Sequence, residues 1–439
     1  MKHYFMFILI LINLPLSAQS LFENAVEGTA KQSQLMEDKT YKLNGFMRGV
    51  FFGGKIPETE KAEMKSGYGE AALKLRVRKQ SFGDGFAEIR FRRGTEFGKP
   101  VSEVNLREAY VNTYAGRFDL RIGHQIVVWG RADGFNPTNN ITPQNMLVRS
   151  PDEDDRREGN FLIRSFYNLH PIRLEFIWVP VYTASVLPTQ LIPLPRGITL
   201  GPMIMPTSDL ENGSLALKLE LALASLDGSV SYFRGFNPMP GITASIQGQD
   251  LLVNPRPYRV QVIGADASTV LGPLGVRGEF AYRRPEGKFE TEFHIPNPDL
   301  QYILGLEKSW GEFSLIAQYI GRKVLEFTEL EPPQSIMELM NHEIASKNRM
   351  IASQQHEISH AISVRPAWTL LHETLHIEFM GFYNFTTEEY LFRPKLSYDI
   401  TDALMGTLGG EIYAGPNETL FGTIDETLSS LFIELKVSF

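Results

Sequence analysis

Apolar and polar residues alternate at every second position in many short stretches of the chain. In residues 71–78 the apolar side chains fall on one face and the basic ones on the other, with Leu73, Leu75 and Val77 opposite Lys74, Arg76 and Arg78. Successive side chains of a β-strand point to opposite faces, so this period predicts strands with one apolar and one polar face. The pattern returns in residues 86–92, 119–125, 173–179, 215–221 and 277–281.

The alternation predicts eighteen strands between about residue 45 and the last residue, with sixteen as the alternative. The connections between them alternate in length. We expect long ones at 54–66, 130–159, 182–211, 237–256, 285–298, 324–354 and 415–426. We expect tight turns at Ser81-Phe82-Gly83, Ala115-Gly116, His170-Pro171, Leu226-Asp227-Gly228, Trp310-Gly311 and Arg365-Pro366. Long loops on one rim and tight turns on the other predict an all-β, transmembrane, antiparallel up-and-down β-barrel.

The two ends of the chain suit export to an outer membrane. Residues 1–20 combine Lys2, an apolar run and small residues near position 20, which predicts a signal peptide. Residues 21–44 then form a polar periplasmic tail, and 45–439 form the barrel. The last strand, 431–439, alternates and ends on Phe439. That ending is typical of segments recognised by the barrel assembly machinery, so we expect this machinery and outer-membrane lipid as partners in a Gram-negative bacterium.

Composition narrows the function without deciding it. The chain has no cysteine, which excludes disulfides and thiol chemistry. It contains 29 Phe, 16 Tyr and 37 Gly, and its net charge of −8 argues against a nucleic-acid partner. A mean hydropathy of −0.15 suits a soluble protein and also a barrel with a polar lumen.

One long connection has a helical pattern. Residues 331–350 place Ile336, Leu339, Met340 and Ile344 at helical spacing, which predicts a helix inside an external loop.

Two H-E-x-x-H stretches resemble a zinc motif, at His356–His360 and His372–His376. The motif needs a helix to bring its two histidines to one metal. Residues 370–379 alternate like a strand, which would hold His372 and His376 roughly 13 Å apart. We therefore expect no metal site, no cofactor and no enzymatic activity. A barrel-seated enzyme remains open, because catalytic groups can meet only in the folded chain.

The long connection 130–159 carries the most informative charges. It contains an acidic run followed by two arginines, which are Asp152, Glu153, Asp154, Asp155, Arg156 and Arg157. One interpretation is a solvated surface loop. The other folds the loop into the lumen, opposite a basic wall of Lys74, Arg76, Arg78, Arg90 and Arg92. Opposed rows of charge in a narrow pore would set its selectivity.

Two regions resemble a known family. The first runs through Gly123-x-Gln125, Val128-Trp129-Gly130 and Ala132-Asp133-Gly134-x-Asn136-Pro137 to residues 152–157. The second comprises Arg393-Pro394-Lys395-Leu396-Ser397-Tyr398, Gly415-Pro416 and Thr419-Leu420-Phe421-Gly422. Together they resemble a porin-like family of bacterial outer-membrane proteins catalogued as a domain of unknown function. The resemblance implies an outer-membrane barrel and no particular substrate.

These observations predict an outer-membrane channel that passes small solutes through a polar, charged lumen. One alternative is a gated transporter or binding protein for a hydrophobic compound, since loop 182–205 is apolar, with Leu187, Leu191, Ile192, Leu194, Ile198, Met203 and Met205. The other is the barrel-seated enzyme.

Overall fold

The computed structural model describes residues 41–55, 61–79, 82–187, 197–248 and 250–439. The predicted signal peptide, and the tail as far as residue 40, lie outside the described residues. Residues Leu43–Phe439 form one compact unit. Among the described residues, no helix is long and apolar enough to cross a membrane.

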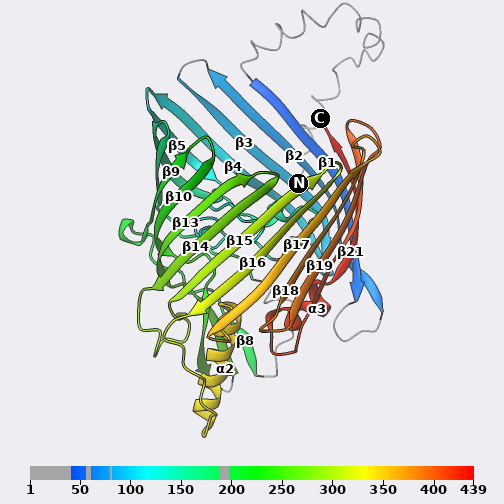
Figure 1. Cartoon of the computed structure of the whole chain (residues 1–439). Helices are drawn as coiled ribbons and strands as arrows, with labels where there is room; N and C mark the ends of the chain where they lie inside the picture. The colour runs from blue at the N-terminus through cyan, green and yellow to red at the C-terminus, as the bar shows by residue number, and fades with distance from the viewer. Residues whose placement is uncertain (1–40, 56–60, 80–81, 188–196, 249) are drawn as a thin grey trace, which may run out of the picture. The chain divides into compact units, whose positions relative to one another are not determined.

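Eighteen strands form one sheet, in which each strand pairs with its neighbours in the sequence. They are β1 (Tyr41–Lys55), β2 (Ala62–Lys79), β3 (Gly83–Glu96), β4 (Lys99–Ala115), β5 (Phe118–Gln125), β6 (Asn160–Leu169), β7 (Ile172–Val179), β9 (Ser214–Ala222), β10 (Leu226–Phe236), β13 (Arg259–Leu271), β14 (Leu274–Pro285), β15 (Asp299–Trp310), β16 (Phe313–Val324), β17 (Ile358–Leu370), β18 (Leu375–Asn384), β19 (Glu389–Asp399), β20 (Leu404–Ala414) and β21 (Ser430–Ser438). The first strand pairs antiparallel with the last, from Phe46↔Ser438 to Gly53↔Leu431, and closes the sheet. The predicted eighteen-stranded antiparallel barrel is confirmed (Figure 1).

The alternation along each strand separates an apolar outer face from a polar inner face. On β2, Leu73, Leu75 and Val77 are exposed, whereas Glu70 and Ala72 on the other face are buried. The same holds on β21, where Leu431, Ile433 and Leu435 are exposed. Inward charges are therefore enclosed, and the outer surface is a continuous apolar belt.

The two rims differ as predicted, with exceptions. Connections on one rim have two to four residues. On the other rim, most are long and carry their own structure, except the short turns at Phe97-Gly98 and 385–388. Two helices lie in long connections, α2 (Ile336–Ile351) and α3 (Leu420–Leu428), together with a small sheet of β8 (Ile198–Leu200), β11 (Gly241–Gln247) and β12 (Asp250–Arg256). The helix predicted within 331–350 is confirmed.

Two predicted turns are wrong. Leu226-Asp227-Gly228 belongs to β10, and the turn precedes it. Arg365-Pro366 lies inside β17, where the ladder to β18 passes from Val364↔Gly381 to Ala367↔Glu378. Proline has no N–H to donate, so it interrupts the ladder without ending the strand. The true turn is 371–374, where Leu371, His372 and Glu373 have φ of 54°, 56° and 67°.

Apolar side chains fill one side of the barrel interior. They come from the connection after β5 and from the facing walls of β6 to β14, and comprise Val127, Trp129, Ile141, Leu162, Ile177, Val179, Ala216, Phe233, Tyr258, Val260, Val262, Ala281 and Ile295. This cluster fixes the connection against one wall. The interior next to β1–β4 and β15–β21 holds smaller apolar clusters, such as Val50, Phe52, Tyr68 and Phe432, and most of the buried charges.

Candidate functional site

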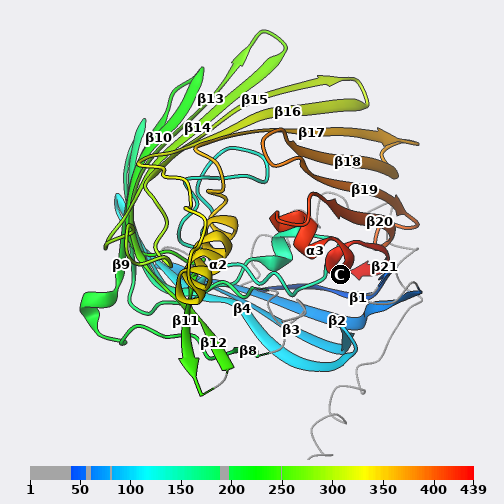
Figure 2. The same cartoon turned by 90° about the horizontal axis from the view of Figure 1, so that it is seen from below.

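The connection between β5 and β6, residues 126–159, lies within the ring of strands. Its side chains and backbone bond to strands around the barrel: to Asp266 on β13, Glu279 on β14, Gln318 on β16, Arg365 on β17, Arg393 on β19, Glu411 on β20, Arg48 on β1 and Arg90 on β3. A single segment can reach all of these inner faces only from inside. Figure 2 shows it crossing the interior, together with α3. We call it the inserted segment.

One carboxylate anchors the first part of the inserted segment. Glu279 accepts the backbone N–H of Arg131 at 3.0 Å and of Ala132 at 3.2 Å. Its other oxygen accepts the N–H of Thr138 at 2.9 Å and the hydroxyl of Thr138 at 2.7 Å. Gly130 has φ of +98°, and a Cβ there would lie 2.6 Å from both carboxylate oxygens. The close approach therefore requires glycine at position 130.

The acidic run forms a short 3₁₀ helix, Glu153–Arg156, capped by Asp152, whose side chain accepts the N–H of Asp154 at 3.0 Å. Asp155 points into the wall. It accepts from Arg48 at 2.7 Å, from Arg90 at 2.6 Å and from the Ser150 hydroxyl at 2.5 Å. Burial alone would raise the pKa of Asp155, but Arg48 and Arg90 outweigh it and hold that pKa well below its ordinary value.

The neighbouring charges of the run bond to strands on the other side of the seam between β1 and β21. Arg156 donates to both oxygens of the fully buried Glu411, at 2.8 and 3.0 Å. Burial would lower the pKa of Arg156, but Glu411 raises it above its ordinary value. Glu153 pairs with Arg393 and, at 3.8 Å, with Arg365. Asp154, which is largely exposed, pairs with Arg157 at 2.9 Å. The run therefore links β1 and β3 to β17, β19 and β20.

Of the predicted basic wall, one residue contacts the acidic run and the others have different surroundings. Arg90 contacts the acidic run through Asp155. Arg92 instead pairs with Glu70 at 2.7 Å and Glu96 at 2.9 Å. Lys74 lies 3.5 Å from Glu88, and Arg76 lies over the ring of Phe86. Arg78 follows on the same inward face of β2 and is exposed, beyond the inserted segment.

The two H-E-x-x-H stretches do not form the helices their motif needs. His356 lies before β17 and His360 within it, while His372 and Glu373 lie in the turn and His376 in β18. The expectation that a continuous strand carries His372 is wrong, because the turn at 371–374 divides it. Within the described ranges, no three His, Asp or Glu residues are grouped to hold a metal.

Three cavities follow one another through the interior. The loop-side cavity, about 530 Å³, shares Gly134 and Asn136 with the central cavity of about 560 Å³. The central cavity shares Arg48, Asp152 and Lys436 with the turn-side cavity of about 320 Å³. This last one reaches Asn44 and Phe439, on the rim with the short turns. The cavities trace a path from one rim to the other, narrowed by the inserted segment.

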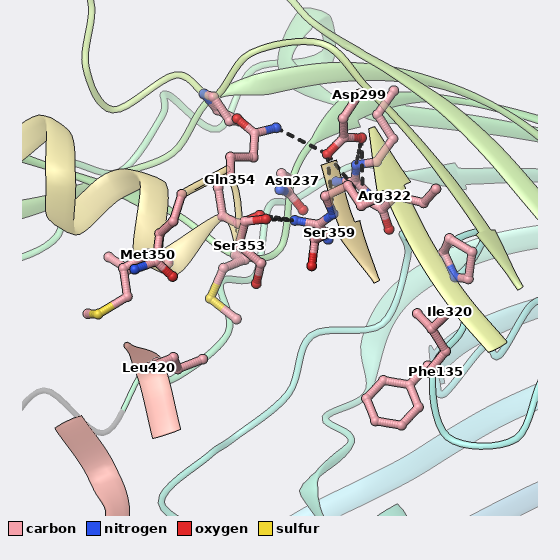
Figure 3. A pocket seen from close by; sticks show the side chains of 18 of the residues that line it. Phe135, Asn237, Asp299, Ile320, Arg322, Met350, Ser353, Gln354, Ser359 and Leu420 are labelled. Atoms are coloured by element: carbon pink, nitrogen blue, oxygen red, sulfur yellow. Dashed lines mark hydrogen bonds and ion pairs between the residues drawn. The ribbon is translucent and has the colours of Figure 1, made fainter. Parts of the chain in front are cut away.

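The lining differs along this path. In the loop-side cavity, Asp299, Arg322 and Gln354 meet on one wall, and Phe135 and Ile320 lie apart from them (Figure 3). The central cavity is lined by thirteen charged residues, which are Arg48, Arg131, Arg157, Arg365, Arg393, Lys395, Lys436, Asp133, Asp152, Glu153, Asp154, Glu378 and Glu434. The inserted segment supplies four of its six anions, and the strands of the wall supply five of its seven cations.

No protein-family model matches the sequence, and no curated protein resembles it in sequence. Solved structures do resemble it. The outer membrane protein opdK of Pseudomonas aeruginosa aligns over 91% of this chain and 98% of its own, with a TM-score of 0.54 and 9% identity. OccAB3 of Acinetobacter baumannii aligns over 91% of this chain and 99% of its own, with a TM-score of 0.54 and 10% identity. A BenF-like porin of Pseudomonas fluorescens aligns over 91% of this chain and 98% of its own, with a TM-score of 0.54 and 8% identity. The chain has an outer-membrane porin fold.

Within this porin fold, sequence reasoning missed several interior charges. Arg48 bonds to Asp155, Glu70 and Glu434 from the inner face of β1, and Glu411 receives Arg149, Arg156 and Arg393. The alternation of β1 could have placed Arg48 on the inner face, because it occupies the opposite positions to the exposed, outward Met47 and Phe51. No such pattern in the sequence places Arg107 inside. It sits at a bulge in β4 and donates to the carbonyls of Asp154, Asp155 and Arg157.

Proposed function

We propose that the protein is an outer-membrane channel that passes small polar solutes, and that it is not an enzyme. The observation that carries this proposal is the series of three cavities that share lining residues from rim to rim. The apolar outer belt suits contact with outer-membrane lipid. The expected export signal and the closing strand that ends at Phe439 suit delivery by the barrel assembly machinery.

The charged central cavity favours polar solutes over the hydrophobic compound of the alternative. Desolvating thirteen charged groups around an apolar solute would be costly, whereas a polar solute can take the place of water at them. Among the similar structures, one is described as OccK2 (OpdF) of Pseudomonas aeruginosa in complex with glucuronate and another as OpdK with vanillate. Solutes of that size and polarity fit the proposal.

We assign selectivity to the residues that face each other across the central and turn-side cavities. These are Asp152, Glu153, Asp154, Asp155 and Arg157 on the inserted segment and Lys74 and Arg90 on the wall. Arg156 contributes by holding the segment to Glu411, and Arg76, Arg78 and Arg92 lie elsewhere on the wall. The motif resemblance supports membership of the porin-like family of unknown function as part of the same proposal.

The test is single-channel recording of the full chain in planar bilayers. We expect a stable open conductance and, when Asp152, Glu153, Asp154 and Asp155 are replaced by Asn or Gln, a reversal potential shifted toward anions, because arginines lose their partners in a poorly screened space. A silent bilayer containing folded protein would contradict the channel. An unmoved reversal potential would leave the channel intact and overturn the role of the run.

A further inference from the structure

The loop-side cavity differs in chemistry from the charged central cavity that adjoins it. Eleven of its lining residues carry side-chain amides, and five carry phenyl or phenol rings. The central cavity has one of each, Asn136 and Phe432. The loop-side cavity, with a volume of about 530 Å³, is within the range of roughly 300–1,000 Å³ for small-molecule sites. Two cavities in series thus present different surfaces to a passing solute.

The ionic groups of the loop-side cavity are already satisfied. Asp299 lies 3.9 Å from Arg283 and 3.7 Å from Arg322, and it accepts from Gln354 at 3.1 Å. Arg322 also donates to the backbone carbonyls of residues 352 and 353. Both cations are thus engaged by protein groups. An anionic solute would find no free cation there and would have to displace Asp299.

The second acidic residue of this cavity is satisfied as well. Glu389 accepts the N–H of Phe421 at 2.6 Å and the hydroxyl of Thr387 at 2.6 Å. The charged side chains of the cavity are two arginines and two carboxylates, so their formal charges cancel. A neutral solute is therefore favoured over an ionised one.

Three half-buried phenyl rings from three elements form an aromatic wall. Phe135 of the inserted segment stacks on Phe382 of β18, with centroids 4.9 Å apart and planes at 26°. Phe382 meets Phe421 of α3 edge to face at 5.9 Å. All three line the cavity. The face of an aromatic ring is electron-rich and attracts polarised C–H groups, such as those on the faces of a pyranose ring.

An amide offers two donors and two acceptor lone pairs, which matches a hydroxyl, itself both donor and acceptor. Most of these amides already bond to the protein, but Asn136, Asn237 and Gln355 each donate only one side-chain hydrogen bond to it and so keep part of this capacity. Many amides beside an aromatic wall, without free charge, suit a ring that carries hydroxyl groups around its edge and C–H groups on its faces. We propose that the loop-side cavity binds neutral carbohydrates of one or two sugar units before they enter the charged path. This inference rests on the proposed channel function and names its substrate class.

The experiment is isothermal titration of the purified full chain in detergent with maltose, glucuronate and vanillate. We expect maltose to bind, glucuronate to bind at least tenfold more weakly, and Phe135→Leu to weaken maltose binding at least tenfold, because the apolar volume stays while the aromatic face is lost. The matched control is Phe313→Leu. Phe313 packs between Trp310 and Trp368, outside this cavity, so its replacement should leave maltose binding unchanged.

Reduced gel mobility on heating shows whether each variant is a folded barrel, and Phe382→Leu replaces Phe135→Leu if the latter does not fold. Absent maltose binding, tighter binding of vanillate or glucuronate than of maltose, or equal maltose affinity in wild type and Phe135→Leu would each overturn the inference. A bilayer without conductance, together with maltose binding, would refute the channel and leave the carbohydrate site standing.

Discussion

Two buried guanidinium groups converge on the carboxylate of Asp155. The side chains of Asp155 and Arg48 are only 4% and 2% exposed, so the pair is almost completely withdrawn from water. Removing one member of a buried pair leaves an uncompensated charge, at a cost of about 3–5 kcal/mol. Asp154, one residue earlier, makes its ion pair at 61% exposure. Exposed pairs contribute roughly 0–1 kcal/mol.

We therefore expect Asp155→Asn to lower the free energy of unfolding by about 3 kcal/mol or more. The matched change Asp154→Asn should lower it by less than about 1 kcal/mol. Equilibrium unfolding in urea, with both variants in lipid vesicles, measures the difference. Equal losses in the two variants would show that Asp155 does not hold the inserted segment as its contacts indicate.

His294 makes the loop between β14 and β15 sensitive to acid. Burial, with a smaller effect of Arg256, lowers the pKa of His294 to about 4. Above pH 6.5 the histidine is neutral whether the loop is closed or open, so it has no effect on loop stability. Between about pH 6.5 and 4 the opened loop binds a proton that the closed loop does not, and the closed state loses stability.

At pH 5 the opening equilibrium of this loop should rise by up to about thirtyfold relative to pH 7.5. Hydrogen exchange of the peptide covering 286–298, corrected for the intrinsic rate at each pH, measures the change. His294→Gln should remove the pH dependence. If the variant keeps the wild-type response, another group is the titrating one.

The anchoring of the inserted segment by Glu279 should control the width of the path between the cavities. Gly130→Ala places a methyl group against the carboxylate and opposes the φ of +98°. The bonds between Glu279 and the inserted segment should then break, and the single-channel conductance should increase because the segment narrows the path less. Gly98→Ala is the control, because Gly98 has φ of +74° and nothing within 4 Å, so it carries a similar backbone strain without a clash. Single-channel conductance compares the two, and an equal response would contradict the anchoring role.

The period-two alternation was enough to predict the strands and their two faces, because the outer face must contact apolar surroundings and the inner face a polar interior. It could not distinguish Pro366 in a turn from Pro366 as a gap in a ladder, since both lack the same hydrogen bond. Helix α3 and the hairpin of β11 and β12 were missed within connections predicted only as long loops. Arg149 bonds to Leu428 and Ser430, about 280 positions away, and such contacts depend on a barrel register that no local pattern contains.

The closing strand pair depends on Phe439. Phe439 donates its N–H to the carbonyl of Gly45 at 3.0 Å and accepts the N–H of Gly45 at 2.9 Å. Deleting Phe439 removes both bonds and the aromatic ring at this position. We expect a lower fraction of folded barrel in the outer membrane, with less change for Phe439→Tyr, which keeps the ring. The fraction with heat-modifiable gel mobility measures this, and full assembly of the deletion variant would contradict it.

The inserted segment also has a mechanical consequence. It is tied to β1 and β3 on one side and to β13, β14, β16, β17, β19 and β20 on the others. Flattening the barrel in any direction would have to stretch several of these short ties together. The segment therefore cross-links the barrel wall from inside, and lateral pressure from the bilayer should hardly change the cross-section of the barrel.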